Sequence, residues 1–127
     1  MNLLFVCKHN RFRSKVAEQI FKQLNKNKSI KVKSAGSNPD YYPVAENVQK
    51  ALKELGYKSV NKHPKKISKE LANWADKIIV VANNVKIENK KVRYWKISDT
   101  SQDNFTGIQR RVKDIEKRVK KLINQLK

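Results

Sequence analysis

A buried strand, a short polar loop and a helix occupy the first 25 residues, and this succession constrains the fold more than any other feature. Residues 2–6 form an apolar run without helical period, which is typical of a strand buried on both faces of a parallel sheet. Residues 7–14 interrupt the run with polar and charged side chains. Over residues 13–25 apolar side chains recur every three or four positions, which predicts a helix after the loop.

Strands and helices are predicted to alternate along the rest of the chain. Further strands are predicted at residues 31–34, 76–81 and 93–97. Further helices are predicted at residues 44–55, 67–75 and 108–126, with Gly56 as the stop signal of the first and a polar loop, 98–107, before the last. This alternation predicts an α/β sandwich with a parallel sheet, in one domain spanning residues 1–127. Ligands bind beyond the carboxyl ends of such strands, where Cys7 and Asp99 both fall.

The composition narrows the classes of partner. The longest apolar runs, residues 3–7 and 78–82, are far shorter than the roughly 20 residues of a membrane span, so no membrane partner is expected. The first residues do not resemble a secretory signal, so we expect a cytoplasmic location. The net charge of +19 would suit nucleic acid, but the lysines are spread over every segment as on a solvated surface. We therefore do not expect a nucleic-acid partner.

Residues 7–14 carry the motif with the clearest chemistry. Cys7 is followed, after five residues, by the pair Arg13-Ser14. The residues between them are Lys8, His9, Asn10, Arg11 and Phe12. A loop that opens a helix directs backbone N–H groups and the positive end of the helix dipole inward, which favours a tetrahedral dianion. The same field stabilises a thiolate, so we interpret Cys7 as a nucleophile, the alternative being a cysteine that only ends an apolar strand.

Three neighbours of Cys7 have predicted roles in this phosphate-binding loop. The planar guanidinium of Arg13 can hold two phosphate oxygens at once. Ser14 can donate its hydroxyl to the thiolate or cap the helix, and the sequence does not separate these roles. Asn10 is suited to a left-handed turn and to side-chain hydrogen bonds that stiffen the loop.

At this loop the chain resembles the low-molecular-weight protein tyrosine phosphatases and the arsenate reductases that share their fold. The resemblance extends to Ser34-Ala35-Gly36, to residues 76–81, to residues 95–99 and to the closing basic helix. It implies a three-layer α/β sandwich with helices on both faces of a four-stranded parallel sheet of strand order 2-1-3-4. It also implies that Cys7 is the nucleophile, Arg13 the phosphate-binding arginine and Asp99 the general acid.

The chain departs from this family at three places. Thr100 follows Asp99 where the family usually has proline, so Asp103 is the alternative general acid. Phe12 replaces the second cysteine that many of these phosphatases carry, which leaves Cys7 prone to oxidation. Arg11 adds a cation at the mouth of the loop, and its effect on anion binding or phosphate release is open.

Two tyrosines and the two histidines give weaker indications of function. Tyr41 and Tyr42 could wall the pocket and stack on an aryl phosphate, or could simply pack in a loop. His9 and His63 are too few and too badly spaced for a metal site, so we expect no metal and no cofactor.

The predicted function is hydrolysis of phosphomonoesters, with phosphotyrosine as the leading substrate. Phosphorylated proteins, small aryl phosphates, and phosphate or other oxyanions are the expected partners. The alternatives are an arsenate reductase that uses an external thiol, and a non-catalytic basic binding module on the same fold.

Overall fold

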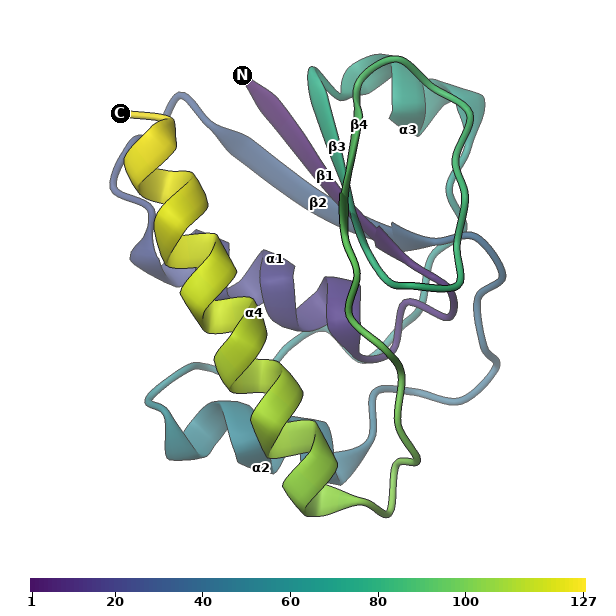
Figure 1. The fold of residues 1–127 in the computed structure, drawn as a ribbon, viewed down its shortest axis with the longest axis vertical. Helices are drawn as coiled ribbons and strands as arrows, with labels where there is room; N and C mark the ends of the chain where they lie inside the picture. The colour runs from purple at the N-terminus through teal and green to yellow at the C-terminus, as the bar shows by residue number, and fades with distance from the viewer.

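A computed structural model describes residues 1–127 and contains a four-stranded parallel sheet of order β2-β1-β3-β4 (Figure 1). The strands are β1 (Asn2–Cys7), β2 (Lys31–Gly36), β3 (Lys77–Val81) and β4 (Val92–Trp95). The helices are α1 (Arg13–Leu24), α2 (Glu46–Glu54), α3 (Lys69–Trp74) and α4 (Phe105–Gln125). The predicted α/β class and strand order are therefore confirmed.

The helices cover both faces of the sheet. On one face α1 and α4 pack together, and α2 packs against α4, whereas α3 lies on the other face (Figure 1). The two faces of β1 are buried accordingly, because Leu3 and Phe5 belong to the core beneath α1 and α4, and Leu4 and Val6 to the core beneath α3. Burial of each such side chain contributes roughly 1.5–3 kcal/mol. The core thus holds β1, and the loop that follows it, at the centre of the sheet.

Two strands are longer than predicted. The parallel ladder pairs Phe5, Val6 and Cys7 of β1 with Ser34, Ala35 and Gly36 of β2, so both strands extend to the edge of the loop that follows β1. The other two are shorter. β3 begins at Lys77, one residue later than predicted, although Asp76 still bonds Asn2 of β1. The Asp76 N–H donates to the Asn2 carbonyl (2.7 Å), and the Asp76 carboxylate accepts from the Asn2 N–H (2.7 Å). β4 ends at Trp95, two residues before Ile97.

Side-chain caps and long-range backbone hydrogen bonds move the ends of three helices. The helix predicted at 108–126 begins at Phe105, because the side chain of Asn104 accepts a hydrogen bond from the Gly107 N–H (2.9 Å). The helix predicted at 67–75 is shorter in the structure, where α3 begins at Lys69 because the Ser68 side chain caps its N-terminus. The helix predicted at 44–55 begins at Glu46, because the Val44 N–H is bonded to a distant carbonyl.

Three smaller differences and one agreement concern the C-terminal ends of helices. The helix predicted at 13–25 ends at Leu24, because Asn25 is already extended. The helix predicted at 44–55 ends at Glu54, and the predicted terminal helix ends at Gln125 rather than 126. Gly56 follows α2 with a φ of +86°, a conformation that glycine adopts without strain, so its predicted role as a stop signal is confirmed.

A close backbone approach makes glycine necessary at the end of β2. A Cβ atom on Gly36 would lie 2.8 Å from the carbonyl oxygen of Lys8 and 2.9 Å from the backbone nitrogen of Asn10. Any other residue here would push the loop after β1 out of position. No helix of the structure combines the length and the apolar character needed to cross a membrane.

Candidate functional site

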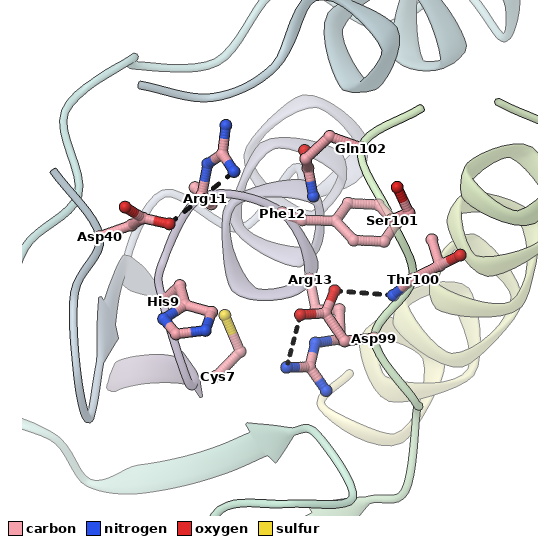
Figure 2. Close-up of a pocket in the computed structure, with 10 residues that line it drawn as sticks. All are labelled: Cys7, His9, Arg11, Phe12, Arg13, Asp40, Asp99, Thr100, Ser101 and Gln102. Carbon is pink, nitrogen blue, oxygen red and sulfur yellow. Dashed lines mark hydrogen bonds and ion pairs between the residues drawn. The ribbon is translucent and has the colours of Figure 1, made fainter. Parts of the chain in front are cut away.

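A pocket of about 250 Å³ opens where the loop after β1 meets the segment after β4 (Figure 2). Its lining residues are Cys7, His9, Arg11, Phe12, Arg13, Asp40, Asp99, Thr100, Ser101 and Gln102. The three predicted catalytic residues therefore lie around one pocket, although Cys7 and Asp99 are far apart in the sequence.

Cys7 lies at the base of this pocket. Its side chain is buried, and its Sγ atom lies 2.9 Å from the hydroxyl oxygen of Ser14. The helix α1 begins at Arg13 with no side-chain cap and no acidic residue in its first turn. Its first N–H groups and its dipole are therefore free to stabilise negative charge at the sulfur or on a bound oxyanion.

Asn10 organises the loop around Cys7. It has a φ of +52°, the left-handed conformation that its side chain tolerates better than most. Its side-chain amide donates to the hydroxyls of Ser14 (2.8 Å) and Ser34 (3.1 Å), and its side-chain oxygen accepts from the Lys65 N–H (2.9 Å). With its side chain fully buried, Asn10 fixes the position of the Ser14 hydroxyl against Cys7.

A second layer of contacts orients Asn10. The hydroxyl of Ser34, in β2, donates its proton to the Glu18 carboxylate on α1 (2.6 Å), so the hydroxyl oxygen can accept a hydrogen bond from Asn10. The buried chain of hydrogen bonds thus runs from Glu18 through Ser34 and Asn10 to Ser14 and Cys7. Such a fully satisfied polar network holds the loop in one conformation.

Arg13 is almost completely buried, with 1% of its surface exposed, yet its guanidinium faces the pocket (Figure 2). Its Nη1 donates to the carbonyl of Ile97 (2.8 Å), and both terminal nitrogens lie 3.4 Å from the side-chain oxygen of Asn84. These contacts, from the segments after β4 and β3, fix the plane of the guanidinium. The remaining donors can bind an oxyanion above Cys7.

Asp99 enters the pocket from the segment after β4. Its Oδ2 lies 3.7 Å from Nη2 of Arg13, and its Oδ1 accepts from the Thr100 N–H (2.9 Å) (Figure 2). Its side chain remains 38% exposed, so water and a leaving group can reach it. Asp103, the alternative acid, is exposed and does not line the pocket.

The other loop residues lie in four different environments. Phe12 is buried, belongs to the main core and lines the pocket. Arg11 crosses the pocket mouth, where its Nε donates to the Pro43 carbonyl (3.1 Å). His9 pairs through Nδ1 with the carbonyl of Asn38 (2.9 Å) and lines the pocket, whereas Lys8 does not.

The structure does not bring Tyr41 or Tyr42 to the pocket wall. Tyr41 is fully exposed, and Tyr42 is 68% exposed with its ring 5.9 Å from the Arg11 guanidinium. Asp40, which the sequence does not single out, lines the pocket instead and lies 3.8 Å from Arg11. The polar pair Arg11–Asp40 thus stands at the mouth.

Several supporting residues carry no local sequence signal. Glu18, Asn84 and Lys65 reach the site from α1, from the turn after β3 and from the segment after α2. Only the tertiary structure shows that they converge. No three His, Cys, Asp or Glu side chains gather as a metal site in the structure.

Comparisons with known proteins identify solved structures with the same fold. The solved arsenate reductase from Archaeoglobus fulgidus is 32% identical, covers 96% of this chain and 98% of its own, and superposes with a TM-score of 0.78. A low molecular weight protein tyrosine phosphatase from T. tengcongensis is 23% identical, with coverages of 98% and 99% and a TM-score of 0.85. An arginine phosphatase from Geobacillus stearothermophilus is 18% identical, with coverages of 98% and 92% and a TM-score of 0.82.

At these identities the last two similarities describe the fold alone. No curated protein sequence matched the chain. The family model described as low molecular weight phosphotyrosine protein phosphatase matches residues 2–127, which is nearly the whole chain. The chain therefore belongs to the low molecular weight phosphotyrosine protein phosphatase family.

Proposed function

We propose that this chain hydrolyses phosphomonoesters through a cysteinyl-phosphate, with Cys7 as the nucleophile and Arg13 as the phosphate-binding side chain. One observation carries the proposal. The Cys7 sulfur, 2.9 Å from the Ser14 hydroxyl, lies at the base of the pocket into which the buried Arg13 guanidinium also faces. A nucleophile beside a fixed cationic fork is the arrangement that phosphoryl transfer to a side chain requires.

In the first step the Cys7 thiolate attacks phosphorus in line with the leaving oxygen. A sulfur–phosphorus bond forms while the bond from phosphorus to the leaving oxygen breaks. The loop N–H groups and Arg13 hold the equatorial oxygens throughout this change. Asp99, in its protonated form, donates its proton to the leaving oxygen, so that the alcohol departs neutral.

In the second step a water molecule attacks phosphorus, and the sulfur–phosphorus bond breaks. Asp99, now a carboxylate, accepts a proton from this water. Cys7 leaves as a thiolate, which the Ser14 hydroxyl can stabilise by donating a hydrogen bond. Inorganic phosphate is released, and each cycle consumes one ester and one water.

Phosphotyrosine, in a protein or as a small aryl phosphate, is the proposed substrate. Family membership supports it, and Phe12 lines the pocket where an aryl ring can pack. Because a structurally similar protein is an arginine phosphatase, phosphoarginine is the competing substrate to compare.

The test compares kcat/KM for a phosphotyrosine peptide, p-nitrophenyl phosphate and phosphoarginine, with the Cys7→Ser variant as the control for contaminating phosphatases. We expect the two aryl phosphates to be hydrolysed faster than phosphoarginine. Faster hydrolysis of phosphoarginine would overturn the proposed substrate but leave the cysteinyl-phosphate chemistry. Absence of all turnover would favour the binding module.

Arsenate reduction with an external thiol is a second candidate, favoured by the 32% identity to an arsenate reductase over nearly the whole chain. The Cys7 thiolate would displace an oxygen from arsenate, which leaves as water after protonation. A thiol would then attack the Cys7 sulfur, so that arsenite leaves with the electron pair and a mixed disulfide forms. A second thiol would restore Cys7, because the chain has no other cysteine. Arsenite formation that depends on glutathione and on Cys7 would support this candidate, and its absence would exclude it.

A further inference from the structure

Lys15 is a buried charged side chain that the proposed reaction does not use. It follows Ser14 in α1, and only 2% of its surface is exposed. Its Nζ donates to the carbonyl oxygen of His63 (2.9 Å) and has no ion pair. An ammonium group has three donors, so two N–H groups remain for another acceptor. A buried charge with so few partners costs free energy that an anion would recover.

Lys15 lines a cleft of about 290 Å³ between α1, β2 and the segment after α2. This volume lies close to the lower end of the roughly 300–1,000 Å³ of small-ligand sites. The cleft shares no lining residue with the pocket at Cys7, so the two are separate.

The cleft has an excess of positive charge. Its lining includes three lysines, Lys15, Lys22 and Lys65, and one carboxylate, that of Glu18. Both oxygens of Glu18 are engaged, one with the Ser34 hydroxyl (2.6 Å) and one with Lys22 (3.0 Å). The charges of Lys15 and Lys65 are thus left without a close carboxylate partner. Lys33 also lines the cleft, but its ammonium lies over the Trp74 ring, 4.4 Å from the centroid.

Burial is the main cause that lowers the pKa of Lys15. Among the neighbouring charges, Glu18 and Cys7 raise this pKa, whereas Lys65 and Lys22 lower it. A bound anion would relieve the repulsion among these lysines.

The cleft also offers a neutral donor. Asn61 lines it, and the side-chain oxygen of Asn61 accepts from the His63 N–H (2.8 Å). Its amide N–H₂ group is therefore free to donate. Ammonium and amide donors around a small cleft suit an acceptor with several oxygens.

We propose that this cleft is a second anion-binding site that takes a phosphate-type oxyanion, held by Lys15, Lys65 and Asn61. The ligand is either free phosphate or the phosphoryl group of a larger molecule, since both present the same oxygens. The proposal does not rest on turnover, because the site is separate from Cys7.

Binding is measured on the full chain after Cys7 has been alkylated with iodoacetamide, by amide NMR shifts that report on each residue. Inorganic phosphate and glycerol phosphate are titrated separately at constant ionic strength. We expect saturable shifts at Asn61 and Lys65. Tighter binding of glycerol phosphate would identify a phosphorylated molecule as the ligand, and binding of phosphate at least as tight would identify the free ion.

Three lysine variants distinguish a site from diffuse attraction. Lys15→Met and Lys65→Met should each weaken binding about fivefold or more, because a charge-assisted hydrogen bond is lost. Lys65→Met keeps the Lys65 backbone N–H that bonds Asn10, and it remains informative if Lys15→Met does not fold. Lys53→Met, at an exposed position on α2, should change the dissociation constant by about twofold or less. Absence of saturable shifts at Asn61 and Lys65, or equal weakening in all three variants, would overturn the proposal.

Discussion

The Nη2 atom of Arg13 lies 3.7 Å from the Oδ2 atom of Asp99, within the pocket that Cys7 closes at its base. The proposed general acid and the proposed phosphate clamp are therefore neighbours. A bound phosphate dianion and an ionised Asp99 carboxylate repel each other and compete for the same guanidinium. In the proposed mechanism Asp99 would therefore protonate the leaving group and would also limit the affinity for anions.

Replacement of Asp99 by Asn should therefore tighten product inhibition. We expect the inhibition constant of inorganic phosphate to fall about threefold to tenfold, because a negative charge near the bound anion is removed. The measurement is steady-state inhibition by phosphate at neutral pH. Asp103→Asn, outside the pocket, is the matched control and should leave the constant unchanged. An unchanged or higher constant in Asp99→Asn would show that Asp99 does not face the bound anion.

The same substitution should have a selective effect on turnover. Asp99→Asn is expected to slow hydrolysis of phenyl phosphate or phosphotyrosine by roughly a hundredfold or more, because a basic leaving oxygen needs a proton. A fluorinated umbelliferyl phosphate should be slowed much less, since its leaving group departs unassisted. Rates are compared for both substrates in Asp99→Asn and Asp103→Asn. The selective pattern in Asp103→Asn would move the acid there, and equal slowing of both substrates by Asp99→Asn would indicate a structural role.

Asn10 should be essential for the loop conformation. Asn10→Ala removes three hydrogen bonds and places alanine at a φ of +52°, so we expect a loss of about 3–5 kcal/mol in the free energy of unfolding. Asn10→Gly removes the same bonds without the backbone strain and should lose about 1 kcal/mol less. Urea denaturation measures both. Equal losses would mean that the left-handed backbone costs nothing at this position.

The loop proposed to be catalytic could be predicted from the sequence because its parts are close in the chain. A buried strand, Cys7, Arg13 and Ser14 lie within one strand–loop–helix unit, and the positions of the backbone N–H groups follow from the start of the helix. Asp99 could be placed near this loop because the ends of parallel strands meet at one edge of the sheet, and because the family resemblance implied the same position.

The side-chain hydrogen bonds that hold this loop in place could not be predicted in this way. Ser34 and Lys65 bond Asn10 directly, and Glu18 bonds Ser34, so the three come from separate segments. No periodicity indicates that a side chain will bond another so far along the chain. The ends of the helices could not be predicted from the hydrophobic pattern either, because a cap such as Asn104 depends on a single side-chain hydrogen bond. The exposure of Tyr41 follows from loop geometry that residue type does not determine.

Stability should depend on pH through Tyr57, which is nearly buried and donates its hydroxyl proton to Glu116 on α4. Burial, with a further contribution from that hydrogen bond, raises the pKa of Tyr57 above its usual value of 10.0. The native state thus keeps this proton to higher pH than the unfolded state. The resulting stabilisation is complete below about pH 10 and is lost as the pH rises beyond it.

Tyr57→Phe should therefore lower the free energy of unfolding by about 1–2 kcal/mol at neutral pH. The difference from the unsubstituted chain should shrink above about pH 10. Urea denaturation from neutral to alkaline pH tests this, with the fully exposed Tyr41→Phe as the control. A difference that stays constant across this range would mean that the hydroxyl of Tyr57 does not titrate differently in the two states.

Rapid-quench kinetics show whether the phosphoryl group is transferred to Cys7 during turnover. On mixing with excess p-nitrophenyl phosphate, the chain should release p-nitrophenolate in a burst that approaches one equivalent, and acid quenching followed by mass spectrometry should locate one phosphoryl group on Cys7. Cys7→Ser should show neither steady turnover nor the cysteine adduct, because a serine hydroxyl is not ionised at neutral pH. Turnover that persists in Cys7→Ser, with no phosphoryl group on Cys7 in the unsubstituted chain, would show that hydrolysis proceeds without a cysteinyl-phosphate.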